Sequence, residues 1–263
     1  MTKINAEQMA RAWDQASLEY DEYFTPRFAP YLGTALGALA ARQMELPPGP
    51  IVVPCVGPGH ELPGLSRVFE GRQVLASDLS KVMVERARAR ATQLSNVVVE
   101  QRDATSLGLP AAGAAGLFSA FGLQLLPDPA LALGHWLELL AAGGALSIVY
   151  WPEHSEPGSP FHVLRELLVR GNVSRADWEQ ALPESIRAGG GRVRLDARVA
   201  FEMQHDDAQS LWRGFSHLGS LRAMAAARGE AAVAELGAEF VQRLPPGPLV
   251  HTPEARLLLI ERE

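Results

Sequence analysis

The sequence predicts an α/β fold in which a doubly wound, mostly parallel sheet carries helices on both faces. Between residues 50 and 151, short apolar runs suited to buried strands alternate with helical segments. Alternation of this kind favours parallel strand pairing through right-handed crossovers. The chain has 263 residues, of which 47% are hydrophobic, and this is enough apolar material for one large core.

The first 45 residues predict two helices. Asn5 and Gln8 have the spacing of a capping box, and apolar residues follow at helical intervals. A second helix is expected from Thr25, because a capping residue followed by Pro26 suits the first helical turn. A cluster of aromatic residues lies between the two helices.

The central part, from 51 to 151, predicts five buried strands with helices between them. The first expected helix covers about 60–69. The second is capped by Ser80 and runs to about 91, and the third starts at 128 and ends at the two glycines 143 and 144. Glycine at that end suits a left-handed cap. The expected strands cover 51–53, 73–77, 96–99, 116–121 and 145–151.

The last third predicts a different mixture of elements. Short helices are expected within 158–182, and residues 192–203 alternate as in a strand with one exposed face. Two further helices are expected across 207–244, and a final strand over 255–260.

Composition limits the function classes. The formal net charge is −6 and the calculated pI is near 5.7, which argues against nucleic acid or an anionic membrane as partner. Cys55 stands alone, so no internal disulfide can form, and a reducing cytoplasmic location is expected. Residues 104–127 carry no charge, but glycines and prolines divide them into short pieces unlike a membrane helix. The N-terminus has no long apolar core, so no signal peptide is expected.

Three segments at the carboxyl ends of successive predicted strands indicate a ligand site. The turn Gly57-Pro58-Gly59 lets a ligand approach the backbone closely. Asp78 ends the second strand, where a carboxylate can accept both hydroxyl groups of a ribose. Asp103 follows the third strand, where a carboxylate can accept the amino group of adenine.

With these residues, the chain resembles the class I S-adenosylmethionine-dependent methyltransferases, and among them the small-molecule group that includes quinone-biosynthesis and natural-product enzymes. The resemblance covers residues 15 to 152 well. It implies a seven-stranded Rossmann-like sheet whose last strand is antiparallel, a helical lid over 1–45, and a methyltransferase domain over 46–263 with helical cap elements near 155–190 and 207–244. The implied cofactor is S-adenosylmethionine, and S-adenosylhomocysteine is its product. The implied cofactor-binding residues are Val56, Gly57, Gly59, Asp78, Leu79, Met83, Asp103, Ala104 and Phe121.

The same resemblance suggests how the acceptor is handled. Tyr20 resembles the family's N-terminal tyrosine, and His154 follows the fifth strand, so both are catalytic candidates, with His217 as a weaker one. Residues 119–126 contain no carboxylate that could hold magnesium, and no Asn/Asp-Pro-Pro-Tyr/Phe motif follows the fourth strand. A metal-independent enzyme for a small-molecule acceptor is therefore expected. The oligomeric state is not predicted.

Two departures from the family pattern leave alternatives open. Val53 stands where the family usually has an acid, and Cys55 where it usually has glycine. A non-catalytic cofactor-binding protein is one alternative. A nicotinamide-dependent oxidoreductase is another, although Leu62 would replace the third glycine of its fingerprint. Asp78 could also be only a helix cap and Asp103 only a turn residue.

Overall fold

The computed structural model describes residues 5–153, 156–170 and 178–263, which form two compact units. The sheet unit comprises Ala29–Trp151, the described part of Asp177–Val199, and Ala255–Glu263. The helical unit comprises the described parts of Met1–Phe28, Pro152–Ala176 and Ala200–Glu254. None of the helices in the described ranges has the length and apolar character that a bilayer crossing needs. The lid proposed for residues 1–45 stays a prediction.

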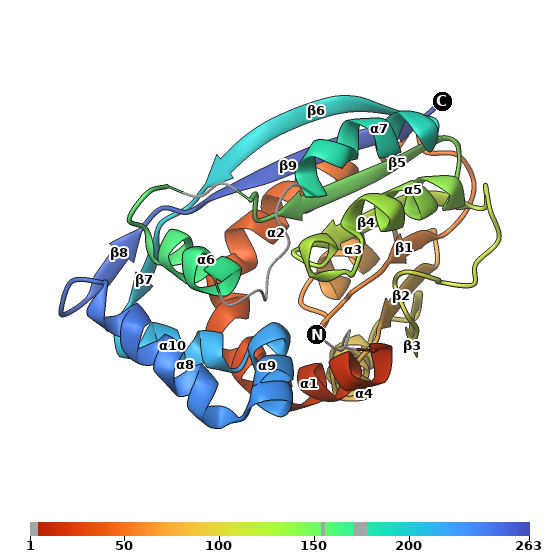
Figure 1. Cartoon of the computed structure of the whole chain (residues 1–263). Coiled ribbons are helices and arrows are strands. Elements are labelled where there is room, and N and C mark those ends of the chain that lie inside the picture. The colour runs from red at the N-terminus through yellow and green to blue at the C-terminus, as the bar shows by residue number, and fades with distance from the viewer. Residues whose placement is uncertain (1–4, 154–155, 171–177) are drawn as a thin grey trace. The chain divides into compact units, whose positions relative to one another are not determined.

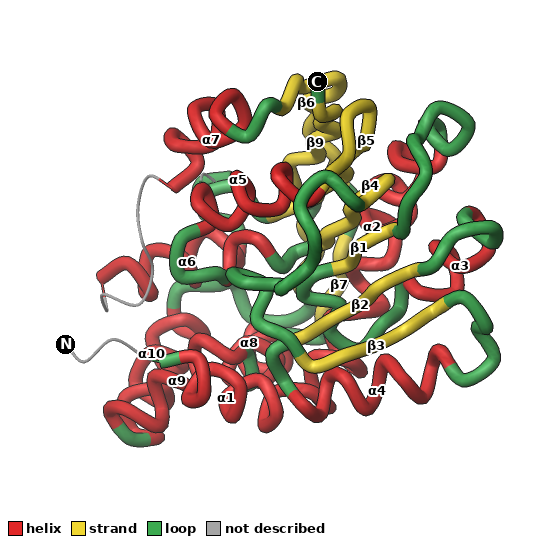
Figure 2. Tube along the Cα trace, turned by 90° about the vertical axis from the view of Figure 1, so that its right-hand side faces the viewer, coloured by secondary structure: helices red, strands yellow, loops and turns green. Residues whose placement is uncertain are grey.

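The sheet unit is built on a seven-stranded sheet in the order β3-β2-β1-β4-β5-β9-β6 (Figures 1 and 2). Neighbouring strands from β3 to β5 are parallel, whereas β9 runs antiparallel to β5. The expected sheet with its antiparallel last strand is therefore confirmed. The strands are β1 Ile51–Val53, β2 Val74–Asp78, β3 Val97–Gln101, β4 Ala114–Ala120, β5 Leu140–Tyr150, β6 Gly191–Ala200 and β9 Glu254–Arg262.

Helices cover both faces of this sheet, as consecutive residues of β5 show. Leu146 and Ile148 belong to the buried core that includes Trp136 of helix α5. Ser147 lies between them and points to the opposite face, where its hydroxyl donates to the Ala35 carbonyl of helix α2 at 2.8 Å. The sheet is thus doubly wound, as the sequence predicts. The helices with residues in this unit are α2 Thr25–Ala40, α3 Leu62–Val68, α4 Lys81–Ala91, α5 Pro129–Leu139, α7 Leu182–Ala188 and the 3-10 turns η2 Leu123–Leu125 and η3 Trp178–Ala181.

The expected boundary between α5 and β5 is wrong. Helix α5 ends at Leu139, and the strand begins at once with Leu140, which pairs with Ala114 of β4. Hydrogen bonds to the neighbouring strand therefore extend β5 backwards. Gly143 has the left-handed conformation expected of it, with φ +77°, but it serves an irregularity in the strand pairing and not a helix cap.

The helical unit contains α1 and most of the last third of the chain. The capping box of Asn5 and Gln8 forms as expected at the start of α1. The strand expected over 192–203 divides, because β7 pairs with β8 in a separate two-stranded sheet. Three helices, not two, occupy 207–244, with breaks before Gly219 and at Gly229. The elements are α1 Ala6–Glu19, the π-helix η1 Tyr20–Phe24, α6 Pro160–Arg170, β7 Met203–His205, α8 Ala208–Ser216, α9 Gly219–Arg228, α10 Glu230–Gln242 and β8 Leu249–His251.

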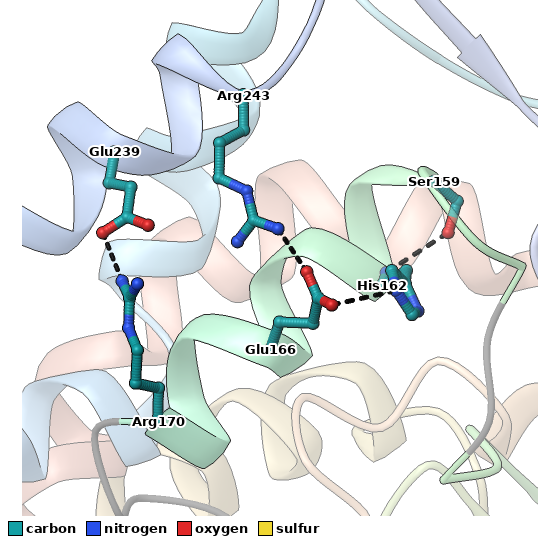
Figure 3. A network of polar contacts seen from close by, with 6 residues as sticks. All are labelled: Ser159, His162, Glu166, Arg170, Glu239 and Arg243. Carbon is teal, nitrogen blue, oxygen red and sulfur yellow. Dashed lines mark hydrogen bonds and ion pairs between the residues drawn. The ribbon is translucent and has the colours of Figure 1, made fainter.

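Ion pairs join α6 to the end of α10 (Figure 3). Glu166 pairs with Arg243, and Arg170 pairs with Glu239. His162 Nε2 also lies 3.4 Å from Glu166. These side chains are largely exposed, so the pairs orient the two helices and add little to stability.

Candidate functional site

The turn after β1 has a backbone shape that depends on its glycines. Gly57 and Gly59 have φ values of +53° and +84°. A Cβ atom at Gly59 would lie 2.9 Å from the Cβ of Ala87 in α4, so only glycine fits between turn and helix. A Cβ at Gly57 would meet no atom within 4 Å. The turn is therefore packed against α4 on one side and open at Gly57.

Asp78 connects this turn to the start of α4. Its carboxylate accepts hydrogen bonds from the backbone N–H of Gly57 and of Ser80, each at 2.9 Å. The Val56 N–H donates to the Ser77 carbonyl at 2.9 Å in addition. The carboxylate at the end of β2 is thus held directly beside the turn after β1.

Asp103 is fixed in the loop after β3. Its Oδ1 accepts hydrogen bonds from the Thr105 N–H at 2.8 Å and from the Thr105 hydroxyl at 2.7 Å. The indole N–H of Trp136 donates to the carbonyl of Ala104 at 2.8 Å. An Asx turn and a buried tryptophan therefore define the position of this second carboxylate.

Cys55 shows that these segments converge. Burial raises the pKa of its thiol well above the ordinary value, and the negative charges of Asp78 and Asp103 raise it further. The sheet register agrees, because Asp78 pairs with Gln101 of β3 and the Arg102 N–H donates to the Asp78 carbonyl at 3.0 Å. Asp103 therefore follows β3 at the edge of the sheet where Asp78 ends β2, and the binding of one shared ligand by both acids stays a prediction.

The end of β4 completes this edge of the sheet. A Cβ atom at Gly122 would lie 2.5 Å from the Cβ of Cys55, so the β4 end and the β1 turn are in close contact. Cys55 and Phe121 are non-glycine residues with φ of +55° and +56°. Backbone strain of this kind concentrates at functional sites. The buried hydroxyl of Ser119 has no hydrogen-bond partner among the residues that the structure describes.

An aromatic stack lies at the same end of β4. The rings of Phe121 and Trp151 stack with centroids 4.5 Å apart, and Tyr31 meets both rings edge-on. Phe121 is a predicted site residue and Tyr31 belongs to the aromatic cluster noted in the first 45 residues, whereas Trp151 was not predicted. The position of Trp151 directly after the fifth strand was the signal that could have identified it.

Glu61 is a second residue that sequence reasoning missed. It lies two positions after Gly59, and it is 9% exposed. Its pKa is raised to about 7, chiefly by burial and further by Asp78, while its own backbone N–H and Arg90 act in the opposite direction. Its place at the start of a helix gave no sequence signal that the carboxyl is buried.

The remaining predicted residues fall into two groups. Val56, Met83 and Ala104 have buried side chains, whereas Leu79 is partly exposed beside Asp78. All four belong to the sheet unit, at or near the same strand ends.

The structure does not test the catalytic candidates. Tyr20 lies in the helical unit, packed against Trp13, Phe24 and Phe28. His154 lies outside the described residues. His217 caps the end of α8 in the helical unit. Their roles stay predictions. The described residues also contain no group of three His, Cys, Asp or Glu side chains placed to hold a metal ion.

Comparison with known proteins supports the resemblance seen in the sequence. Residues 51–144 match the family model described as "Methyltransferase domain". A trans-aconitate 2-methyltransferase from Methylobacterium radiotolerans is 28% identical over 181 residues, covering 68% of this chain and 65% of that protein. The aklanonic acid methyltransferase DauC from Streptomyces sp. (strain C5) is 27% identical over 146 residues, covering 53% of this chain and 63% of that protein. The chain thus spans less than two thirds of either relative.

A solved structure shows the same fold over almost the whole chain. Geranyl diphosphate C-methyltransferase from Streptomyces coelicolor A3(2), in complex with Mg²⁺, geranyl diphosphate and S-adenosyl-L-homocysteine, superposes with a TM-score of 0.57 at 13% identity and covers 98% of both chains. The matched family model coincides with the strands and turns that carry Gly57, Asp78 and Asp103. Residues 51–144 therefore match a methyltransferase domain, in agreement with the resemblance to the class I S-adenosylmethionine-dependent methyltransferases that the sequence indicates.

Proposed function

We propose that this protein transfers a methyl group from S-adenosylmethionine to a small-molecule acceptor. The observation that carries the proposal is the position of both acids at one edge of the sheet: Asp78 accepts the Gly57 N–H of the glycine turn, and Asp103 follows the β3 residues that pair with the end of β2. Two separate carboxylates next to an open backbone turn match the two polar ends of an adenosine, its ribose and its adenine.

The residues present fit the cofactor. The open side of Gly57 leaves room for a ligand against the backbone, and the partnerless Ser119 hydroxyl marks a buried polar position that a ligand could satisfy. In our proposal, Asp78 accepts the ribose hydroxyls, Asp103 accepts the adenine amino group, and the turn at Gly57 and Gly59 lies against the methionine part. Met83 and Phe121 flank the adenine. When bound, the cofactor supplies an electrophilic methyl group on a sulfonium.

The protein's own contribution to the reaction is alignment and exclusion of water. Methyl transfer is an in-line displacement, so the acceptor atom must be held opposite the sulfur. We propose Tyr20 as an aromatic neighbour of the sulfonium and His154 as a general base for acceptors that carry a proton. The names of the two relatives give trans-aconitate and aklanonic acid as their substrates. We propose a small organic acceptor for this protein as well.

A binding experiment tests the cofactor assignment. S-adenosylhomocysteine should stabilise the protein against heat, by about 2.7 kcal/mol when its concentration is 100 times Kd, and NADPH should not. Asp78→Asn should weaken S-adenosylhomocysteine binding about 10- to 100-fold, because hydrogen bonds to a charged group contribute about 1.5–3 kcal/mol.

Asp128→Asn is the matched control. Asp128 also accepts a backbone N–H, from Leu131 at 3.0 Å, but it lies at the start of α5. This variant should bind as the wild type does. Stabilisation by NADPH instead would favour an oxidoreductase, and stabilisation by neither ligand would contradict the proposal.

A further inference from the structure

The turn after β1 contains a buried carboxyl group that the proposed adenosine contacts do not use. Glu61 lies two residues after Gly59, with His60 between them, and precedes Leu62, the first residue of α3. Backbone hydrogen bonds fix its position, from the Gly59 N–H to the Val56 carbonyl at 3.0 Å and from the Leu62 N–H to the Gly59 carbonyl at 3.2 Å. The carboxyl is therefore held by the same turn that lies open at Gly57.

Charged groups of opposite sign act on Glu61 from two elements. Asp78 approaches from the end of β2 and repels a second negative charge. Arg90 approaches from α4, but its guanidinium donates to the Pro58 carbonyl of the turn at 2.7 Å. His60, next in the chain, is exposed. Burial and Asp78 together raise the pKa of Glu61 to about 7, so this carboxyl is ready to ionise beside a positive ligand.

The other two carboxylates at this edge of the sheet are assigned to the adenosine in our proposal, and both also accept hydrogen bonds from the backbone. Asp78 holds the N–H groups of Gly57 and Ser80, and Asp103 holds Thr105. The end of β1 contributes Val53, which is apolar and fully buried. Glu61 is thus the buried carboxyl of the turn that remains for a cationic ligand group.

We propose that Glu61 binds the α-ammonium group of the cofactor's methionine part. The inference rests on the proposed function, because it needs S-adenosylmethionine at the turn. An ammonium carries three N–H donors and one positive charge, which together offset the repulsion between Glu61 and Asp78. Glu61 is on this view a cofactor-binding residue that supplies an anionic contact which β1 itself lacks.

The proposal predicts a proton balance that a merely structural carboxyl would not show. Binding of an ammonium favours the ionised form of Glu61, so S-adenosylhomocysteine binding should release protons below about pH 7. Its affinity should therefore fall up to about tenfold for each pH unit below 7. Methylthioadenosine contains the adenosine and the sulfur but no ammonium, so its affinity should not follow this trend.

Isothermal titration calorimetry with both ligands tests the proposal. Glu61→Gln should weaken S-adenosylhomocysteine binding about 10- to 100-fold and leave methylthioadenosine binding within about twofold of wild type. Glu70→Gln, at an exposed position just after α3, is the matched control and should bind both ligands normally. Far-UV circular dichroism checks that each variant is folded.

The outcomes separate this inference from the proposed function. Equal S-adenosylhomocysteine affinity in wild type and Glu61→Gln overturns the role of Glu61 while the proposed function stands. Binding of neither ligand to wild type overturns both. The pH series on the unmodified protein needs no variant, and an S-adenosylhomocysteine affinity that is flat between about pH 7 and 5 also overturns the inference.

Discussion

Two histidines in the helical unit, His205 buried and His251 half-buried, should make the protein sensitive to mild acid. The Nε2 atoms of His205 and His251 lie 3.0 Å apart, and the Tyr23 hydroxyl lies 2.8 Å from His205 Nδ1. A hydrogen bond between two imidazoles requires one of them to accept with a neutral nitrogen. Protonation of both rings would place two positive charges in contact.

The surroundings of the pair also disfavour charge. Burial, then His251 and then Arg27 lower the pKa of His205 to about 3. Burial lowers the pKa of His251 to about 4. Arg27 lies over the Tyr23 ring, 4.1 Å from its centroid, so the cation that faces this cluster adds to the repulsion.

These shifts set the size and the direction of the pH effect. A histidine of the unfolded chain has a pKa near 6.5, so the unfolded state binds protons below this pH while the folded state does not. Stability contributed by the neutral pair is present above about pH 6.5 and is lost as the pH falls toward 4. Between pH 7 and pH 5 the loss is about 2 kcal/mol for each histidine, or ~4 kcal/mol for the pair.

Urea unfolding, followed by circular dichroism between about pH 8 and 5, measures this loss as a change in the free energy of unfolding. The double variant His205→Asn and His251→Asn should be less stable at neutral pH but much less sensitive to acid. His135→Asn, at an exposed position on α5, should keep the wild-type pH dependence. An identical pH dependence in the double variant and the wild type would refute the reasoning.

Two further predictions concern Cys55. Gly122→Ala should destabilise the protein by about 1–3 kcal/mol, because the new Cβ would lie 2.5 Å from the Cβ of Cys55. Cys55→Gly removes that obstacle and suits the positive φ of position 55. The double variant should therefore recover most of the lost free energy of unfolding, as measured in urea. Strictly additive changes in the free energy of unfolding would contradict the contact. The Cys55 thiol should react with iodoacetamide more slowly at neutral pH than a free thiol does, because burial and then Asp78 and Asp103 raise its pKa. A rate equal to that of free cysteine would show that the thiol is not shielded in this way.

The sequence predicted the sheet well because its local signals agree with the tertiary packing. The apolar runs at β1, β2 and β4 are too short and too apolar for surface helices, and Ser80 caps α4 as its position suggests. The start of β5 could not be predicted, because its pairing of Leu140 with Ala114 is a contact between distant residues. The small sheet of β7 and β8 was missed for the same reason. Its strands have three residues each, and His205 and His251, whose rings are in contact, are 46 residues apart in the sequence.

The site shows a similar division between local and distant signals. Gly57, Asp78 and Asp103 follow strands, and strand ends can be read from the chain, so their convergence was predictable. Glu61 was not, because nothing in its immediate sequence distinguishes a buried carboxyl from an exposed one at a helix start. The close contact between Gly122 and Cys55 depends on the pairing of β1 with β4, so it could not be predicted from the sequence alone.

The bonds of Asp78 bear on two interpretations of this residue that the sequence left open. Ser80 is the cap of α4, because its hydroxyl accepts the Met83 N–H, whereas Asp78 accepts the Ser80 N–H with one oxygen and the Gly57 N–H with the other. A carboxylate has about four acceptor positions, so holding the backbone is compatible with accepting ribose hydroxyls. The backbone bonds then have a functional consequence, because they fix the carboxylate before the ligand arrives and reduce the entropy lost on binding. In our proposal, the same backbone bonds that hold Asp78 beside the turn therefore orient it for the ribose.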